Sequence, residues 1–161
     1  MRRLPTSMRL VALPAALVAA LLTTSVAVAA EPAAATDATL IAGRGTLAAS
    51  GAGTARVAGS FVLVGSMDGG WVKVSGLAGP DIVRVTGFGS RTRLADGSIL
   101  FRNVHGKVYV AGRRVVVTLS GPHIRFIATG RGIAWLRGVG TYSVNGGRPQ
   151  RWSSIGLSAA F

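Results

Sequence analysis

The sequence of 161 residues contains no cysteine, so disulfide bonds and thiolate metal ligands play no part in its fold. Without such cross-links a protein depends on packing, and a domain of ordinary size buries enough apolar surface for that. Carboxylates are scarce as well, because five acidic residues stand against 18 lysines and arginines, with only two histidines. This composition offers little material for a metal site or for a pair of catalytic acids.

Motifs of the common catalytic classes are also missing. The chain has neither a Gly-x-Ser-x-Gly nucleophile motif nor a His-Glu-x-x-His zinc motif. The Gly-Arg-Gly triplet at 130–132 lacks the third glycine and the following helix of a dinucleotide-binding loop. The two histidines, His105 and His123, are interpreted as surface residues at the starts of strands. We therefore expect no enzymatic activity, no cofactor and no metal site.

The pattern of apolar residues lacks the period of an amphipathic helix. Short runs rich in valine and isoleucine alternate apolar and polar positions instead, which is typical of strands with one buried face. The clearest of these runs are residues 99–102, 107–110, 114–119 and 124–129. The chain is therefore predicted to be all-β.

Glycine-containing turn sequences separate these runs. Asp-Gly pairs at 68–70 and 96–97 are typical of hairpins, because glycine accepts the positive φ that such turns require. Gly-Pro at 79–80 and 121–122 and Asn-Gly-Gly at 145–147 predict further breaks. We expect about nine or ten short strands, arranged as a small antiparallel β-barrel or β-sandwich.

Three segments follow one another along the chain. Residues 1–30 have a basic start, an apolar run and small residues at the end, which is the pattern of a secretory signal peptide. Residues 31–38 are predicted to be an alanine-rich linker, and residues 39–161 a single all-β domain. The protein is therefore expected to be exported, to the extracellular space, the periplasm or the cell wall.

One stretch of the sequence is approximately repeated further along the chain. Residues 49–59 and 128–138 share alanine or glycine at five positions, at an offset of 79 residues. Other short repeats occur at offsets of 36, 42 and 43, which argues against a strict solenoid and suits a β-meander with an internal duplication. Glycine weakens a strand, so a sharp bend, the close approach of another backbone or an aromatic ring, or a ligand should compensate, and we favour the bend. The glycines interpreted as structural are Gly51, Gly53, Gly130, Gly132 and Gly138.

The charge suggests the chemistry of a partner. Without the three arginines of residues 1–30, the net charge falls from +13 to +10. Such a charge favours anionic envelope polymers or an anionic lipid surface, and nucleic acid less so. Arginines within predicted strands are candidates for an anion-binding face, with aromatic residues beside them, although we favour a merely hydrated outer surface as their explanation. The candidate arginines are Arg84, Arg102, Arg114, Arg125 and Arg137, and the candidate aromatic residues are Trp71, Tyr109 and Trp135.

These observations favour an exported, non-enzymatic protein of the cell envelope, with a binding or structural role. Two alternatives remain open. Residues 156–161, Gly-Leu-Ser-Ala-Ala-Phe, resemble the C-terminal strand of outer-membrane β-barrels, although Ala159 stands where that strand usually has an aromatic residue. A carrier that holds a small apolar ligand inside the predicted barrel is the second alternative.

Overall fold

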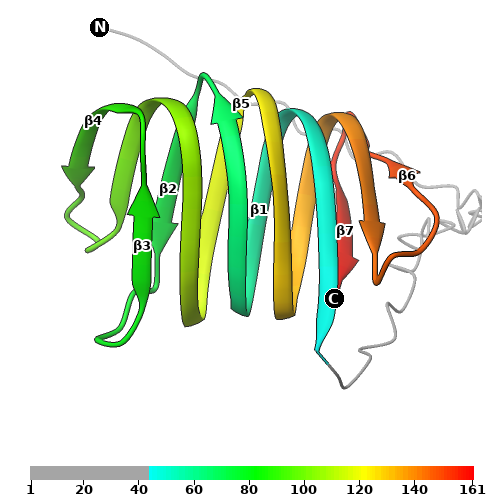
Figure 1. Cartoon of the computed structure of the whole chain (residues 1–161), viewed down its shortest axis with the longest axis horizontal. Coiled ribbons are helices and arrows are strands. Elements are labelled where there is room, and N and C mark those ends of the chain that lie inside the picture. The colour runs from blue at the N-terminus through cyan, green and yellow to red at the C-terminus, as the bar shows by residue number, and fades with distance from the viewer. Residues whose placement is uncertain (1–43) are drawn as a thin grey trace, which may run out of the picture. The chain divides into compact units, whose positions relative to one another are not determined.

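The computed structural model describes residues 44–161, which form strands and turns and contain no helix (Figure 1). The all-β prediction is therefore confirmed for this part of the chain. The predicted signal peptide, the linker and the first residues of the predicted domain lie outside the described residues. In the part that is described, no helix is long and apolar enough to span a membrane.

Seven strands form one sheet, and each of the other six pairs with β5. The prediction of nine or ten short strands is wrong, because β1 has 24 residues and β5 has 46. The strands are β1 (Gly45–Asp68), β2 (Trp71–Ser75), β3 (Ile82–Val85), β4 (Phe88–Arg93), β5 (Ile99–Val144), β6 (Gln150–Arg151) and β7 (Leu157–Ala160).

The two long strands wind around each other. β1 pairs antiparallel with β5 along both of its edges, so that Val64 lies opposite Tyr109 on one side and Ile127 on the other. β5 therefore returns alongside β1 after one winding, and Figure 1 shows the two ribbons coiling side by side. β2 lies between two passes of β5, because Trp71 is opposite both Arg102 and Ser120. Along β2 the residue numbers increase, while the numbers of the paired residues in β5 decrease.

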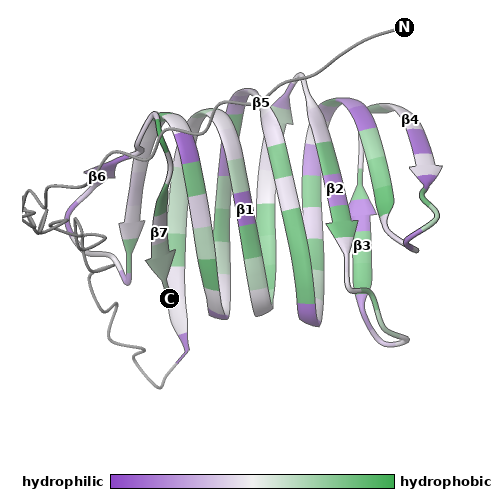
Figure 2. Cartoon of the chain, turned by 180° about the vertical axis from the view of Figure 1, so that it is seen from behind, coloured by the Kyte–Doolittle hydropathy of each residue, from purple (hydrophilic) through white to green (hydrophobic). Residues whose placement is uncertain are grey.

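The winding produces two walls, which we name by the register of their strands. The rear wall of Figure 1 comes to the front in Figure 2, where β2 and β7 lie nearest the viewer. It consists of residues 54–58, 71–75, 99–102, 116–120, 133–137 and 157–160. The front wall consists of residues 46–50, 62–66, 82–85, 107–111, 125–129 and 141–144.

Side chains that point inward from both walls form one apolar core. Alternate residues along the strands are buried, as the period of two predicts, and the green and purple residues alternate along the ribbons of Figure 2. Core side chains from both walls are 1% exposed or less, among them Val57, Leu63, Val110, Leu119, Phe126 and Leu136. The core thus supplies the stability that a chain without disulfide bonds needs.

The chain passes from wall to wall without ending its strands. The predicted break at Gly121-Pro122 is wrong, because both residues lie inside β5. Gly121 pairs with Gly53, and the register then skips to Ile124 opposite Gly51, so Pro122 and His123 are left outside the ladder. Proline has no N–H to donate, and a position outside the ladder accepts it without loss.

The two echoing segments pair with each other. Arg56 lies directly opposite Trp135, and these residues occupy equivalent positions at the offset of 79. The glycines match across the same ladder, because Gly53 faces Gly138 and Gly59 faces Gly132. The repeated glycine spacing therefore places glycine opposite glycine when the two segments run antiparallel.

These glycine pairs allow two backbones to approach each other closely. A Cβ atom at Gly53 would overlap the carbonyl oxygen of Arg137, and one at Gly138 would overlap that of Ala52. Both glycines also have positive φ, at 134° and 133°, which side-chain-bearing residues rarely adopt. Added Cβ atoms would likewise meet backbone oxygens at the three other glycines, those of Val139 at Gly51, Ser60 at Gly130 and Ala58 at Gly132. A close backbone approach therefore accounts for these glycines, at the places where the strands change walls.

Candidate anion-binding faces

The acidic side chains of residues 44–161 are already engaged within the protein. Asp68 lies 2.8 Å from a ring nitrogen of His105, and Asp96 lies 3.1 Å from the ammonium group of Lys73. Asp81 accepts hydrogen bonds from two backbone N–H groups, at 2.7 and 3.0 Å. Among these described residues, no arginine forms an ion pair with a carboxylate. The carboxylates of this part of the chain therefore do not neutralise its guanidinium groups.

The structure separates the five candidate arginines. Arg102 and Arg137 lie on the rear wall, whereas Arg84 and Arg125 lie on the front wall. Arg114 sits at a bend with a φ of 57°, between the pairings of Gly112 and Val115. The five therefore do not share one face.

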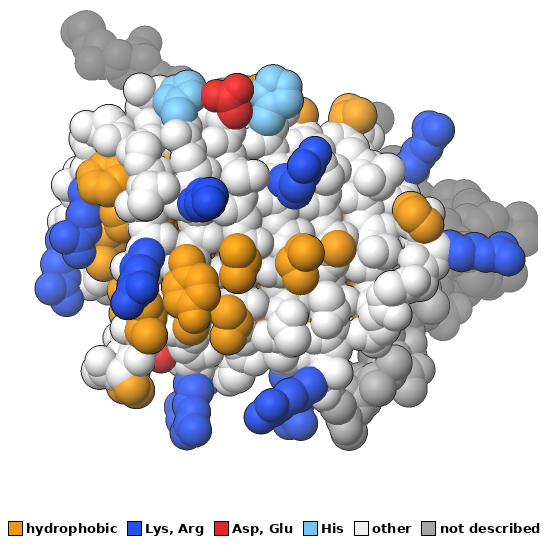
Figure 3. Space-filling view, viewed as in Figure 1, with side chains coloured by type: hydrophobic (Ala, Val, Ile, Leu, Met, Phe, Trp, Pro, Cys, Tyr) orange, Lys and Arg blue, Asp and Glu red, His pale blue; other side chains and the backbone are white. Residues whose placement is uncertain are grey.

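The aromatic candidates divide in the same way. Trp71 and Trp135 point outward from the rear wall, while Tyr109 lies on the front wall opposite Arg84. Around Tyr109, the front wall exposes Val64 and Ile127, at 53% and 51%. Figure 3 shows this wall with apolar side chains near its centre and cations around them.

The rear wall brings cations and tryptophans together. Two neighbouring rows of side chains cross its strands, and residues within a row are cross-strand partners. One row runs Arg137, Thr54, Ser120, Trp71 and Arg102; the other runs Trp135, Arg56, Thr118, Lys73 and Leu100. We call the six cations and tryptophans of these rows the tryptophan face, namely Arg56, Trp71, Lys73, Arg102, Trp135 and Arg137.

Two depressions mark the tryptophan face. The larger, of about 810 Å³, lies over Val116 and Thr118, between Arg56 on one side and Lys73 on the other. The smaller, of about 640 Å³, is lined by Trp71, Lys73 and Arg102 among others. Short residues of the middle strand form the floor of the larger depression, and the longer side chains of its neighbours form the sides.

Local contacts fix several groups of this face. A Cβ atom at Gly156 would lie 2.6 Å from the indole nitrogen of Trp135, so the backbone at Gly156 packs directly against that ring. The Nε atom of Arg137 donates to the carbonyl oxygen of Ser154 at 3.2 Å. Trp71 is 37% exposed, so part of its ring is open to a ligand.

Lys73 is oriented by the turn that precedes β5. Its ammonium group donates to Asp96, whose carboxylate also accepts from the backbone N–H and the hydroxyl of Ser98. The hydrogen bonds from Ser98, followed by that from Lys73, lower the pKa of Asp96 from 3.8 to about 2. Asp96 therefore stays charged at neutral pH and holds Lys73 at the edge of both depressions.

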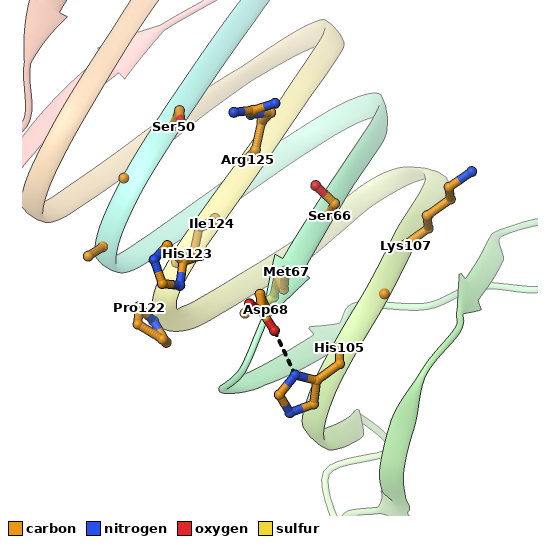
Figure 4. Close-up of a pocket in the computed structure, with 13 residues that line it drawn as sticks. Ser50, Ser66, Met67, Asp68, His105, Lys107, Pro122, His123, Ile124 and Arg125 are labelled. Carbon is orange, nitrogen blue, oxygen red and sulfur yellow. Dashed lines mark hydrogen bonds and ion pairs between the residues drawn. The ribbon is translucent and has the colours of Figure 1, made fainter.

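A third depression, of about 680 Å³, lies at the rim of the front wall. Figure 4 shows Asp68 and His105 on one side of it and His123 on the other. The second ring nitrogen of His105 lies 3.0 Å from the side-chain oxygen of Asn103, so both nitrogens face an oxygen atom. Lys107 and Arg125 line the same depression, and Figure 4 shows their side chains above the two histidines.

Sequence reasoning missed Arg56 and Lys73 on the rear wall, and Lys107 on the front wall. Each is an outward position of a strand, so the alternation of apolar and polar residues was the signal that could have identified them as exposed. Alternation does not reveal how the strands are aligned with one another. It is this register that places Arg56 beside Trp135 and Lys73 beside Thr118. Comparison of the chain with protein-family models, curated proteins and solved structures finds no match.

Proposed function

We propose that this protein is an exported, non-enzymatic component of the cell envelope that binds an anionic polymer through the tryptophan face. One observation carries the proposal: four cations and two tryptophans occupy neighbouring rows of one wall, and its three arginines have no carboxylate partner within residues 44–161. Cations attract a polyanion, and aromatic rings beside them stack on its sugars or bases.

The spacing of the face suits an extended chain. Neighbouring strands lie about 4.8 Å apart, and Arg137 and Arg102 are separated by three strands within one row. The row therefore offers positive charge over roughly 20 Å, with Trp71 between the two arginines. A polymer lying across the strands contacts a positive charge, an aromatic ring and a second positive charge in turn. A small anion is too short to contact all three.

The proposed location rests on the sequence of residues 1–30, which has the three parts of a secretory signal. At that location acidic envelope polymers and anionic lipid surfaces are the abundant polyanions. We therefore propose acidic polymers of the envelope as the first partner, with nucleic acid less favoured.

Several observations make the other functions less attractive. In a catalytic triad the second nitrogen of the histidine faces a nucleophile, whereas that of His105 faces Asn103. A membrane-spanning barrel carries its apolar residues outward, whereas here Leu63, Phe126 and the other core residues point inward. A carrier needs an internal cavity, and the three depressions described above open to the outside.

We also propose that the wound sheet is best regarded as a sandwich of two walls that arose by internal duplication. The pairing of the two echoing segments, centred on Arg56 and Trp135, supports this idea. A duplicated segment that pairs with its own copy gives a local twofold arrangement without further sequence change.

The test of the polymer-binding function is a salt series with a matched charge control. The triple variant Arg56→Ala, Arg102→Ala, Arg137→Ala is compared with Arg113→Ala, Arg131→Ala, Arg148→Ala, which removes the same charge from exposed sites elsewhere. Binding of each purified protein to acidic wall polymer, heparin and DNA is measured. We expect the first triple to weaken binding strongly and to lower the slope of log K against log salt by about 2–3.

The control triple should change affinity only slightly, through the weaker long-range field. Equal losses in the two triples would show that overall charge attracts the polymer and that the tryptophan face has no special role. No binding by the unaltered protein near physiological salt would overturn the proposed function.

A further inference from the structure

The front wall carries a second arrangement of cations, distinct from the tryptophan face. Lys107, Ser66, Arg125 and Ser50 are successive cross-strand partners in one row, so positive side chains alternate with hydroxyl groups. All four line the rim depression of about 680 Å³, and Figure 4 shows them side by side on neighbouring ribbons. We call these four residues the serine–cation row.

The cations of this row are not neutralised by any acidic side chain that the structure describes. Within residues 44–161, neither Lys107 nor Arg125 forms an ion pair. The carboxylate that lines the same depression, Asp68, is bonded to His105 at 2.8 Å. The row itself contains no acidic side chain that would repel an anion.

The geometry matches one tetrahedral oxyanion. Lys107 and Arg125 stand on either side of Ser66, each one strand away, so their Cβ atoms lie about 5 Å from that of Ser66. Both long side chains therefore reach a group placed over the serine hydroxyl. An arginine fork, an ammonium group and hydroxyl donors together satisfy several oxygens of a phosphate, more than the two of a carboxylate.

The support beneath the row is rigid. Ser66 and Arg125 lie in the doubly paired part of β1 and β5, next to the buried residues Met67, Ile124 and Phe126. Their backbone positions are therefore fixed before a ligand arrives, and only side-chain torsions are lost on binding.

We propose that the serine–cation row is a binding site for a phosphate group, either free or as part of a phosphodiester polymer. The site lies on the opposite wall from the tryptophan face and does not depend on it. Lys107 and Arg125 neutralise the charge, while the hydroxyl groups of Ser66 and Ser50 donate to the remaining oxygens.

The experiment is a titration of the full chain with inorganic phosphate, followed by backbone amide NMR shifts, with acetate at equal ionic strength as the carboxylate comparison. We expect saturable shifts at Ser50, Ser66, Lys107 and Arg125 with phosphate and much smaller shifts with acetate. A parallel titration with a poly(glycerol phosphate) distinguishes the source: tighter binding per phosphate in the polymer assigns the site to a diester, and equal binding assigns it to free phosphate.

Three variants test the residues. Lys107→Ala with Arg125→Ala should weaken phosphate binding by about tenfold or more, and Ser66→Ala should weaken it by roughly threefold without any change in charge. The charge-matched pair Arg113→Ala with Arg131→Ala should leave it within about twofold.

Two outcomes would overturn the proposal: the absence of saturable shifts at the row with either phosphate source, or equal shifts with acetate and phosphate. The Arg56, Arg102, Arg137 triple should retain phosphate binding. A failure of polymer binding at the tryptophan face is thereby distinguished from a failure of this site.

Discussion

The two walls of this protein have the same inner surface and different outer ones. Inward positions of both walls are apolar and join one core, as Val57 on the rear wall and Leu63 on the front wall illustrate. Outside, the rear wall gathers Trp71 and Trp135 among cations, whereas the front wall exposes Val64 and Ile127 and keeps its cations toward the margins. Strand alternation constrains only the inward positions, so each outer surface is free to acquire its own binding chemistry.

The largest expected effect comes from a variant that disrupts the close backbone approach at the places where the strands pass from one wall to the other. Gly138→Val places a branched side chain against the carbonyl oxygen of Ala52, at a φ of 133°. We expect a loss of about 4 kcal/mol or more in the free energy of unfolding, because neither backbone has room to move and the valine is strained as well. Urea unfolding followed by circular dichroism measures this loss.

Gly79→Val is the control, because no atom lies within 4 Å of a Cβ at that position and its φ is not positive. Its stability should stay within about 0.5 kcal/mol of the unaltered protein. If Gly138→Val is equally harmless, the close approach of the two strands is not needed for folding.

The next largest effect distinguishes polymer binding by the rear wall from polymer binding by the front wall. Removing both rings, Trp71→Ala with Trp135→Ala, should weaken binding of a sugar- or base-containing polyanion by about 1–3 kcal/mol per ring, because stacking is lost. The dependence of binding on salt should stay the same, since no charge is removed. Isothermal titration calorimetry at several salt concentrations measures both quantities.

Tyr109→Ala on the front wall provides the comparison for this double variant. It removes an outward aromatic side chain beside Arg84 but leaves the tryptophan face intact. Polymer affinity should not change. An equal loss for Tyr109→Ala would mean that the polymer contacts both walls.

A smaller effect tests how Trp135 is held. Gly156→Ala pushes a methyl group against the indole, at a φ of 104°, and should displace the ring from its place beside Arg56. We expect a shift in tryptophan fluorescence, a loss of about 1 kcal/mol in stability and a few-fold weaker polymer binding.

Gly146→Ala is the matched control, since its φ is also positive, at 69°, but no atom lies within 4 Å of the added methyl group. It should reproduce the loss of stability without the change in fluorescence. The same fluorescence change in both variants would argue against a specific contact between Gly156 and Trp135.

The smallest expected effect concerns pH. Because the pKa of Asp96 is lowered from 3.8 to about 2 in the folded protein, its bonds to Ser98 and Lys73 stabilise the fold above pH 3.8 and are lost as the pH falls toward 2. NMR titration of the Asp96 carboxyl group should give a midpoint near 2. A midpoint near 3.8 would show that the carboxylate is not bonded to Ser98 and Lys73 in solution.

Asp96→Asn extends the same test to binding on the rear wall. The variant removes a negative charge beside Lys73 and should tighten polymer binding about twofold at neutral pH. Asp68→Asn removes a charge of the same sign at the rim of the front wall, and it should leave polymer binding at the tryptophan face nearly unchanged.

Much of the fold could be read from local sequence. Alternation predicted the inward residues of 107–110 and 124–129, and the turns at 96–97 and 145–147 lie where the glycines indicated. The hairpin predicted at 68–70 is wrong, because β1 and β2 each pair with β5 and not with each other. The strand lengths could not be predicted, because Gly121 and Gly138 bend β5 while its ladder continues, and a bend and a chain reversal have the same glycine-rich sequence.

The candidate sites were predictable only in composition. Arginines and tryptophans at outward strand positions were evident, but Arg84 and Arg102 proved to lie on different walls, and Arg114 at a bend. Neither the partner of a strand nor the wall that it joins follows from alternation, since every strand of an all-β protein has the same period.

Local alternation and composition were enough to predict that residues 44–161 form strands, which side chains of runs such as 107–110 and 124–129 face the core, and that the basic groups outnumber the acids. These properties depend on neighbours along the chain and on composition. The pairing of distant strands was needed to place Arg56 opposite Trp135, to set Lys107 and Arg125 on either side of Ser66, and to put the two groups on opposite walls. The reason is that register and winding depend on contacts between residues far apart in the chain, where glycine pairs such as Gly53 and Gly138 let the strands approach and turn.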